Sequence, residues 1–530
     1  MPSEFLTQEQ KDQYGCFAGE PNETQLARYF HLDDTDRQLI EKRRGDCNRL
    51  GFALQLTTVR FLGTFLPDPT NVPTTVIHFV ARQLSISNLA SLSKYMERKA
   101  TRYTHSNEIQ KQFNYRDFQS PPWKFRLSRL LYTRSWISNE RPSLLFDFAT
   151  GWLIQHKILL PGASTLTRLI SEVRERATSR IWKRLSALPS MAQVAKLETL
   201  LEIPEGSRTS RFDLYRKGPV TISGPSFNKA VNRYQELKAF GMQELDFTGI
   251  PPVRFKNIAR HAGMISMHKI SRMQEQKRTA ILVAFVKAYE TIALDEALDV
   301  LDLLITYIAG EAKKIGQKKR LRTLKDLDKS ALVLADVCTL MLNKSMQDGQ
   351  LRSAIFAKIT PERLTESIDT VHELARPNDE NFQDEMVEQY GRVRRFLPNL
   401  LRNIEFKAAP AGKSILEAHK CLADLLESRK QLLERAPLDI VSPPWKRLVF
   451  DKEGRVTKRG YTLCFLDRLQ DGLRRRDIYV ENSDRWGDPR AKLLQGKEWQ
   501  ANRIQVCRSL GHPLKPQEAI DGLVNDLRIR

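Results

Sequence analysis

The stretch from 28 to 69, RYFHLDDTDRQLIEKRRGDCNRLGFALQLTTVRFLGTFLPDP, constrains the fold of this chain more than any other feature. Its first half predicts a helix that Asp33 or Asp34 caps and that ends with the basic pair before Gly45. Asp46 then caps a second helix, whose apolar residues face nearly every direction. Such a helix belongs in a protein core, because it is too short and too polar to cross a bilayer.

One charged residue, Arg60, interrupts the apolar helix. An unpaired buried charge is costly, so a carboxylate should lie against it. The candidates nearest in sequence are Asp33, Asp34 and Asp36. We expect a structural ion pair with one of them, and a functional arginine is the alternative. The stretch therefore predicts the packed centre of a small helical domain.

The segment from 142 to 185 has the pattern of a helix-turn-helix. A helix that ends near Ile158 meets the turn LLPGAS, and Ser164 or Thr165 caps the next helix. That second helix is rich in arginine, and in this motif the helix after the turn enters the major groove of DNA. The alternative is an ordinary helical hairpin with a solvated basic face.

The charge of the whole chain favours the DNA interpretation. It has 85 Lys and Arg against 63 Asp and Glu, a formal net charge of +22. Such an excess favours a polyanionic partner, nucleic acid first and anionic membrane second, although ribosomal association or solubility alone would give the same total. The chain opens without a signal peptide, and its six cysteines are far apart without a C-x-x-C pair. We therefore expect a soluble protein of the bacterial cytoplasm, with no cysteine zinc site and no membrane partner.

The stretch KAAPAGKSILEAH imitates a phosphate-binding loop through Gly412 and the Lys-Ser pair after it. The first glycine of that motif is needed so that the backbone can wrap a phosphate, and Lys407 occupies its position. We find no convincing strand before it. Ser414 and Glu417 instead match a capping box that opens a helix, so we expect no ATP binding.

No catalytic or metal centre emerges from the motifs. H-E-x-x-H and G-x-S-x-G are absent from the sequence. His261 and His268 are metal ligands by type, but their spacing fits no helical pair, so we interpret them as surface histidines. Metal-dependent phosphoryl transfer needs two or three convergent carboxylates, and the acidic residues here lie on helices, mostly in caps and ion pairs.

Several stretches spread over essentially all 530 residues carry a family resemblance. They are FLTQEQ, YGCFAGEP, QLARYFHLDDTDRQLIEKRRGDCNRLGFALQLTTVRFLGTFLPDPTNVP and FVARQL near the start, then LYRKGPVTISG, ARHAG, LEAHKCLADLL and GLRRRDIYVENSDRWGDPRAKLL. With these stretches the chain resembles the N-terminal region of class II (Tn-three family) replicative transposases. Asn114 stands where the family usually has glycine, and since asparagine tolerates a left-handed backbone, we expect the turn to survive.

The resemblance implies a function and its limits. In that family the N-terminal half is helical and its DNA-binding domains recognise the terminal inverted repeats of the transposon, with helical linker and dimerisation regions after them. Catalysis comes later, from an RNase H-like domain whose Asp-Asp-Glu triad holds two magnesium ions. This sequence stops at GLVNDLRIR, before the triad would appear. We therefore expect DNA-end binding without strand cleavage, no catalytic residue and no cofactor, magnesium being implied only for the absent domain.

The resemblance also puts two basic segments in DNA-binding domains, from which we predict the contact residues. They are Arg98, Lys99, Arg102, His105 and Arg116 in the first domain, and Lys124, Arg126, Arg129, Arg168, Arg174, Arg176 and Arg180 in the second. Most should touch phosphates and a few should read base edges. A solvated surface charge is the alternative for any one of them.

The predicted fold is mainly α, a multi-domain helical protein with helix-turn-helix-like DNA-binding domains and a small β-hairpin near the C-terminus. The hairpin would pair 448–450 with Val456 across a DKEG turn. The predicted regions are an N-terminal DNA-binding domain (1–118), a second DNA-binding domain (119–205), a linker with a small helical domain (206–285), a helical dimerisation or scaffold region (286–440), and the hairpin with closing helices (441–530).

The sequence therefore predicts specific binding of double-stranded DNA, the terminal inverted repeats, as part of a transposase in DNA transposition. A homodimer or pairing with full-length transposase is the expected protein contact. The alternatives are a competitor or regulator formed by a truncated transposase, an enzyme part whose companion chain supplies the catalytic domain, and a general basic helical scaffold that binds polyanions.

Overall fold

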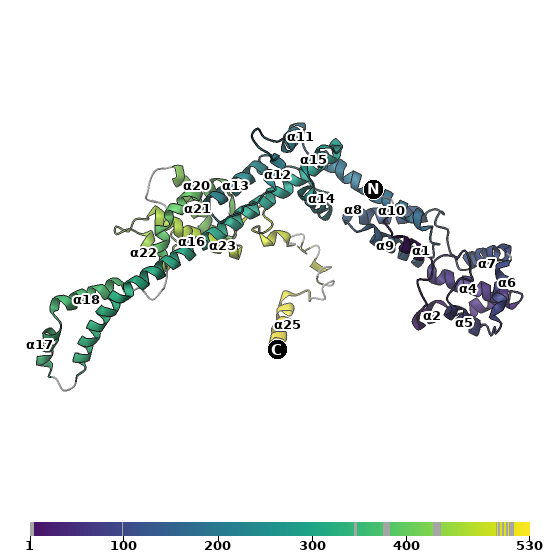
Figure 1. Ribbon diagram of the computed structural model, residues 1–530, viewed down its shortest axis with the longest axis horizontal. Helices are drawn as coiled ribbons and strands as arrows, with labels where there is room; N and C mark the ends of the chain where they lie inside the picture. The colour runs from purple at the N-terminus through teal and green to yellow at the C-terminus, as the bar shows by residue number, and fades with distance from the viewer. Residues whose placement is uncertain are drawn as a thin grey trace. The chain divides into compact units, whose positions relative to one another are not determined.

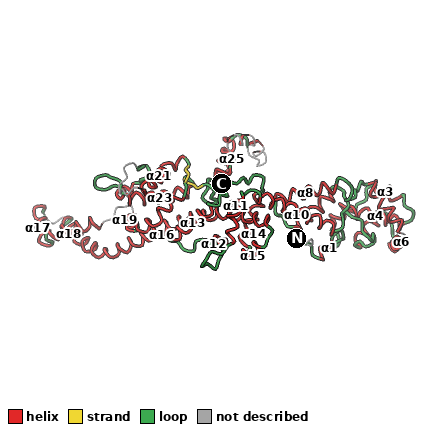
Figure 2. The backbone as a smooth tube through the Cα atoms, turned by 90° about the horizontal axis from the view of Figure 1, so that it is seen from above, coloured by secondary structure: helices red, strands yellow, loops and turns green. Residues whose placement is uncertain are grey.

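The structure is a computed structural model, and helices dominate the part of the chain that it describes (Figures 1 and 2). The described residues are 5–97, 99–343, 347–374, 382–427, 436–493, 496, 499–500, 503–504, 507 and 513–529. The predicted mainly α fold is confirmed. The chain divides into two compact units: unit 1 comprises Met1–Arg211 and Gly241–Val286, and unit 2 comprises Phe212–Phe240 and Lys287–Arg530. The five predicted regions stay a prediction.

The first core of unit 1 is built around one helix, α4. The elements of this part are α1 (Gln8–Gln13), α2 (Glu23–Tyr29), α3 (Asp34–Glu41), α4 (Asp46–Leu62), α5 (Thr74–Gln83), η1 (Leu89–Leu92), α6 (Ser93–Glu97) and α7 (Lys99–Gln112). Helix α4 contacts α2, α3, α5, α6 and α7. Every residue from Leu50 to Val59 is buried. Because α4 has neighbours all round, it can be apolar all round, as the sequence predicted.

The junction between α3 and α4 differs in part from the prediction. Asp33 caps α3 and forms a capping box with Asp36, so one of the two predicted caps is confirmed. Helix α3 ends at Glu41, before the basic pair. Gly45, at φ 83°, is the N-cap of α4, and Asp46 is its first helical residue, without a side-chain cap. The left-handed glycine therefore turns the chain into α4 instead of ending α3.

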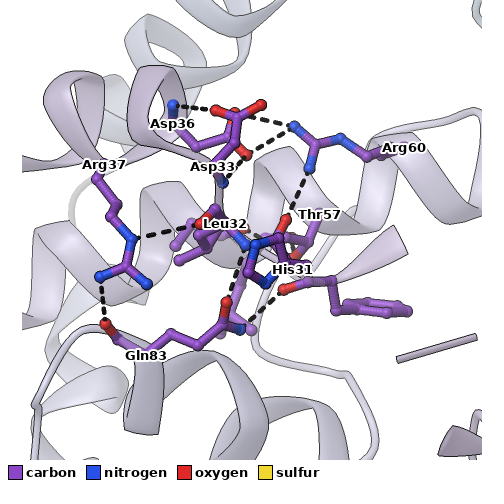
Figure 3. Close-up of polar contacts among 11 residues, drawn as sticks. His31, Leu32, Asp33, Asp36, Arg37, Thr57, Arg60 and Gln83 are labelled. Atoms are coloured by element: carbon purple, nitrogen blue, oxygen red, sulfur yellow. Dashed lines mark hydrogen bonds and ion pairs between the residues drawn. The ribbon is translucent and has the colours of Figure 1, made fainter. Parts of the chain in front are cut away.

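The predicted ion pair of Arg60 forms with Asp36 (Figure 3). Arg60 Nη2 lies 2.9 and 3.0 Å from the two carboxylate oxygens, and Nη1 donates to the carbonyl oxygen of His31 at 3.1 Å. The Asp36 side chain is 0% exposed and that of Arg60 is 25% exposed. Gln83 braces the same loop by accepting from the backbone N–H of Leu32 at 2.9 Å. The pair therefore has a structural role: it holds α3 against the end of α4.

The second core of unit 1 is formed by three helices that pack on one another. They are α8 (Trp123–Ile137), α9 (Pro142–Gln155) and α10 (Ala163–Ser186). Trp123, Leu127 and Leu131 lie four residues apart on α8, so they share one face and enter this core together. Phe5 and Tyr14, on either side of α1, pack against the same core. The start of the chain therefore contributes to the second core.

The predicted helix-turn-helix has the expected order of elements but different ends. Helix α9 ends before Ile158, which forms an isolated β-bridge with Arg116. Helix α10 has Gly162 as its N-cap, so the predicted caps Ser164 and Thr165 are wrong. The N–H of Thr165 donates to the carbonyl oxygen of Gly162 at 2.9 Å, which puts both predicted caps inside the first turn.

Backbone contacts tie the two cores of unit 1 together. The N–H of Leu160 donates to the carbonyl oxygen of Gly63 at 3.0 Å. Gly63 ends α4 at φ 74°, and a Cβ there would lie 2.7 Å from the side chain of Ile154. Asn114, between the cores, has φ 57°, which confirms its expected left-handed backbone. The connection therefore depends on residues that tolerate this conformation.

Short helices complete unit 1. They are α11 (Met191–Glu198), η2 (Thr199–Leu201), α14 (Pro252–Met264), α15 (Met267–Ser271) and the first turns of α16 (Glu275–Met341). Arg254 of α14 donates to Asn139 Oδ1 at 2.6 Å and to Thr178 Oγ1 at 2.8 Å. This arginine fastens α14 to the second core.

Unit 2 contains most of α16 and the helices that follow it. Its further elements are α12 (Arg211–Tyr215), α13 (Gly224–Lys238), α17 (Asp348–Lys358), α18 (Pro361–Leu374), α19 (Gln383–Glu388), α20 (Tyr390–Asn403), β1 (Phe406–Ala408), η3 (Pro410–Gly412), α21 (Lys413–Glu427), α22 (Pro443–Val449), α23 (Lys458–Arg475), β2 (Ile478–Val480), η4 (Pro489–Lys492) and α25 (Pro516–Ile529). Helix α20 packs on α13 and α21, and α23 packs on α21 and α22. The basic stretch 317–327 is a continuous part of α16.

The strands of unit 2 are not where the sequence predicted them. β1 and β2 pair antiparallel, with Phe406 opposite Val480. The predicted hairpin near 448–456 forms only in part: an isolated antiparallel bridge joins Phe450 to Val456 across the predicted turn, whereas Leu448 and Val449 belong to α22 and not to a strand. The reason is burial at helical spacing: Val449 and the tryptophan four residues before it both enter the core from α22.

The loop around Gly412 also corrects the sequence interpretation. Helix α21 begins at Lys413, so Ser414 lies inside its first turn and is not the cap of a capping box. The strand β1 precedes this loop, although none was expected. A Cβ on Gly412 would lie 2.3 Å from the carbonyl oxygen of Asp477, so the glycine is needed for close backbone packing. Within the described residues, no helix has the length and apolar character needed to span a membrane.

Candidate nucleic-acid interface

A groove of 650 Å³ runs between α8 and α10 in unit 1. The polar and aromatic side chains that line it are those of Gln119, Lys124, Phe125, Ser128, Arg129, Tyr132, Glu172 and Arg176. Its floor includes Leu169 and Val173, which belong to the second core. The groove therefore combines a rigid apolar floor with polar walls.

One stripe of α8 beside its buried face builds one wall. Phe125, Arg129 and Tyr132 follow one another at spacings of four and three, which places them on a single helical stripe. Phe125 is 71% exposed. An aromatic side chain held in solvent between basic groups is typical of surfaces on which nucleotides stack.

The groove has an excess of positive charge. Lys124 and Arg129 come from α8 and Arg176 from α10, and all three are exposed. Among the described lining residues Glu172 supplies the negative charge, and Arg168 approaches its carboxylate at 4.0 Å from outside the groove. An exposed pair at this distance contributes little, so the groove keeps its attraction for an anion.

Two further arginines of α10 extend the basic surface past the groove. Arg180 Nη1 donates to Tyr132 Oη at 3.1 Å, and its Cζ lies 5.2 Å from the ring centre of Trp136. Arg184 Cζ lies 5.5 Å from the same ring. A cation over an aromatic face is held in place by about 0.5–1 kcal/mol at an exposed site. The rings therefore orient both guanidinium groups on one side of the helix pair.

A second aromatic ring holds two predicted contact residues at the start of α8. Arg116 Cζ lies 4.6 Å and Arg126 Cζ 5.0 Å from the ring centre of Trp123. Both arginines are exposed. The two arginines that the sequence analysis predicted here therefore lie at the surface, and the ring of the buried tryptophan holds them in position.

Arg174 lies apart from the other predicted contacts of α10. It is half-buried and lines a small cavity with Glu140 and Arg254. Burial lowers the pKa of Arg174, and burial followed by the charge of Arg174 lowers that of Arg254. Arginine stays charged throughout the physiological range. Arg174 therefore faces the junction with α14 more than the groove.

The predicted contacts of the first core have mixed positions. Arg98 lies outside the described residues, and Lys99 is exposed at the start of α7. Arg102 Nη1 donates to the carbonyl oxygen of Pro67 at 3.1 Å. His105 is 5% exposed, and burial is the main cause that lowers its pKa to about 4. Its Nδ1 lies 2.7 Å from the hydroxyl of a buried tyrosine, so His105 has a structural position in the core.

The sequence reasoning missed the aromatic part of this surface. Phe125, Tyr132 and Trp136 were not selected, and neither was Arg184. A usable signal existed, because the three aromatic residues fall outside the stripe of buried residues on α8. Selecting only charged residues overlooked it.

The described residues do not form a metal centre. No group of three or more His, Cys, Asp or Glu side chains in the described part could hold an ion. His261 and His268 are both exposed, as the sequence analysis expected.

Comparison with known proteins shows what this chain is similar to. The family model described as a domain of unknown function (DUF4158) matches residues 5–173, which include both cores of unit 1. The chain is 57% identical over 527 residues to the transposase for transposon gamma-delta of Escherichia coli (strain K12), covering 99% of this chain and 53% of that protein.

More distant relatives are also transposases, and each is matched over most of this chain. The transposase for transposon Tn501 of Pseudomonas aeruginosa is 28% identical over 90% of this chain and 48% of its own length. The transposase for transposon Tn1546 of Enterococcus faecium is 24% identical over 94% of this chain and 50% of its own length. The chain thus spans about half the length of the curated relatives it matches.

Proposed function

This chain is related over nearly its whole length to transposases, and from that premise we propose that it binds DNA during transposition, as a member of the Tn-three family would. The DNA is double-stranded and carries the terminal inverted repeats of the transposon, and the chain acts as the N-terminal part of a replicative transposase. The single observation that carries the proposal is the basic and aromatic groove between α8 and α10.

The charges of this surface support contact with phosphates. Lys124 and two exposed arginines line the groove. Further exposed arginines continue along α10, which has 24 residues and is therefore about 36 Å long. A helix of this length is longer than the major groove of DNA is wide, so phosphates on both sides lie within reach. The proposed phosphate contacts are Arg116, Lys124, Arg126, Arg129, Arg168, Arg176, Arg180 and Arg184.

The aromatic residues support a part in reading sequence. Phe125 and Tyr132 present apolar edges between the cations of the groove. Apolar side chains can contact thymine methyl groups or wedge between base steps, and such contacts depend on the sequence. We assign base contact to Phe125 and phosphate contact to its basic neighbours.

The first core supplies a second, smaller set of contacts in the proposal. Lys99 and Arg102 lie on α7 with donors on or near the surface, and Arg98 remains a prediction. His105 and Arg174 are left out, because His105 is buried and Arg174 is half-buried against α14.

The test is fluorescence anisotropy of the purified chain on a terminal-repeat duplex and on a scrambled duplex, at several salt concentrations. Wild-type protein should bind the repeat more tightly, and log K should fall steeply with log salt. Arg129→Gln/Arg176→Gln should reduce the salt slope by about 1.8, or about 0.9 for each lost phosphate contact.

The matched control replaces two exposed arginines of α20, as Arg394→Gln/Arg402→Gln, and should leave the slope unchanged. Equal affinity for both duplexes would contradict the proposal and would indicate a general polyanion-binding scaffold.

The proposal also includes pairing of this chain with a second copy of itself or with a longer transposase. Light scattering of the chain alone and with bound duplex measures it.

A further inference from the structure

A second cavity, in unit 2, has a basic lining that the proposed groove does not use. It has a volume of 290 Å³ and lies where the chain enters α13. The side chains that matter for its chemistry are those of Lys217, Thr221, Ser223, Ser226, Lys229 and Arg233. Asp and Glu are absent from its lining in the described part of the chain.

The charges at this cavity do not cancel. Lys217 and Lys229 are exposed at its rim, and Arg233, 9% exposed, lies deeper. Arg233 Nη2 pairs with Glu296, which approaches from outside the lining, and Nη1 donates to the carbonyl oxygen of Lys217. One glutamate therefore faces three cations, which leaves an excess of two positive charges.

The deep arginine also retains hydrogen-bonding capacity. Arg233 Nε is buried without a hydrogen-bond partner among the described residues. Buried N–H groups are nearly always paired, so a donor left without an acceptor calls for an explanation. Arg233 belongs to the cavity lining, and an anion bound in the cavity would also neutralise the two lysines.

Hydroxyl groups and a helix end complete the wall. Ser223 Oγ accepts from the N–H of Ser226 at 3.3 Å and so caps α13, and Thr221 Oγ1 lies 3.5 Å from it. The N-terminal pole of this 15-residue helix adds a partial positive charge at the same place. Ammonium, guanidinium and hydroxyl groups around one space are the donors that recognise phosphate.

We propose that this cavity binds a phosphate group of the DNA backbone. The assignment to DNA rests on the function proposed above, whereas the affinity for phosphate rests on the cavity itself. Its volume of 290 Å³ lies just below the range of ligand pockets, about 300–1,000 Å³, which suits a phosphate with its sugar and not a base pair. Unit 2 thus positions the duplex without reading its sequence.

The first experiment measures duplex binding by the full chain with Lys217→Gln/Lys229→Gln. The salt slope should fall by about 1.8, because two lysines would no longer release counterions, while the preference for the repeat duplex stays unchanged. The charge-matched control Lys446→Gln/Lys452→Gln, on exposed residues elsewhere in unit 2, should keep the wild-type slope. Lys217→Arg/Lys229→Arg should restore it.

The second experiment uses inorganic phosphate as the probe and needs no DNA. Phosphate should raise the thermal midpoint of the wild-type chain above that in chloride of equal ionic strength, and Lys217→Gln/Lys229→Gln should abolish the difference. If the wild-type chain shows no preference for the repeat, the proposed function fails, and this experiment alone decides about the cavity.

Two results would overturn the inference. A phosphate effect that persists in Lys217→Gln/Lys229→Gln, or that is absent from the wild-type chain, would mean that the cavity is not a phosphate site. A phosphate effect that needs both lysines, together with an unchanged salt slope on DNA, would refute the DNA assignment and indicate a free phosphate compound as the ligand.

Discussion

Replacing Arg60 by methionine should loosen the first core of unit 1 more than any surface charge change. The arginine is the partner of Asp36, whose side chain is 0% exposed, at 2.9 Å. Breaking a buried pair by removing one partner costs about 3–5 kcal/mol, since a charge is left buried and unpaired. Arg60 keeps 25% exposure, and water can replace part of it, so the lower end, about 3 kcal/mol, applies.

The assay is hydrogen exchange of the full chain, followed by mass spectrometry on peptides from α4. Tryptophan fluorescence cannot report on this core, because residues 1–122 contain no tryptophan. A loss of about 3 kcal/mol in local opening free energy corresponds to exchange about 150-fold faster in α4. Exchange in α8 and α10 should change much less, since the pair lies in the first core.

The control is Arg49→Met on the same helix. Arg49 lies 3.7 Å from Asp46, whose side chain is 56% exposed, and such pairs contribute about 0–1 kcal/mol. A second variant, Asp36→Asn/Arg60→Met, removes both charges and should recover part of the protection. If Arg60→Met accelerates exchange in α4 no more than Arg49→Met does, the reasoning about the buried pair is refuted.

Three other predictions concern buried histidines, a close glycine and the groove. Burial lowers the pKa of His105 and of His419 to about 4, so the unfolded chain takes up the proton first as pH falls below 6.5. The free energy of unfolding should therefore be highest above pH 6.5 and lower by about 2 kcal/mol per histidine at pH 5. Urea unfolding of the wild type and of His105→Gln at both pH values checks this. Gly412→Ala should lower the thermal midpoint of unit 2, because its Cβ would meet the carbonyl oxygen of Asp477 at 2.3 Å and overpacking costs about 1–3 kcal/mol; an unchanged midpoint would contradict the packing role. Phe125→Ala, at a side chain 71% exposed, should leave the midpoint unchanged and reduce the preference for the repeat duplex in anisotropy, whereas equal loss on both duplexes would show that the ring does not read sequence.

Local patterns predicted the features that depend on near neighbours in sequence. The apolar helix α4 and the cap at Asp33 each follow from residues within a few positions of one another, and the left-handed Asn114 followed from the family resemblance. The pairing of Arg60 with a nearby aspartate also followed, because a buried charge requires a partner.

Features that depend on distant partners escaped the same reasoning. His105 looked like a surface contact on a basic helix, yet a tyrosine ten residues before it holds it in the core. Val449 looked like part of a strand, but its burial on α22 made the segment helical. The groove needed both α8 and α10, so neither the position of Phe125 beside Arg176 nor the cavity volume could be inferred from either helix alone.

The sequence by itself determined that this protein is helical, strongly basic and similar to transposases, because periodicity, charge and motif content are local or summed properties. Tertiary structure decided which of the basic residues stay at the surface, which aspartate accepts Arg60, and where cations and aromatic rings combine into a groove. The physical reason is that burial and pairing are set by contacts between helices, and such contacts join residues that lie far apart in the chain.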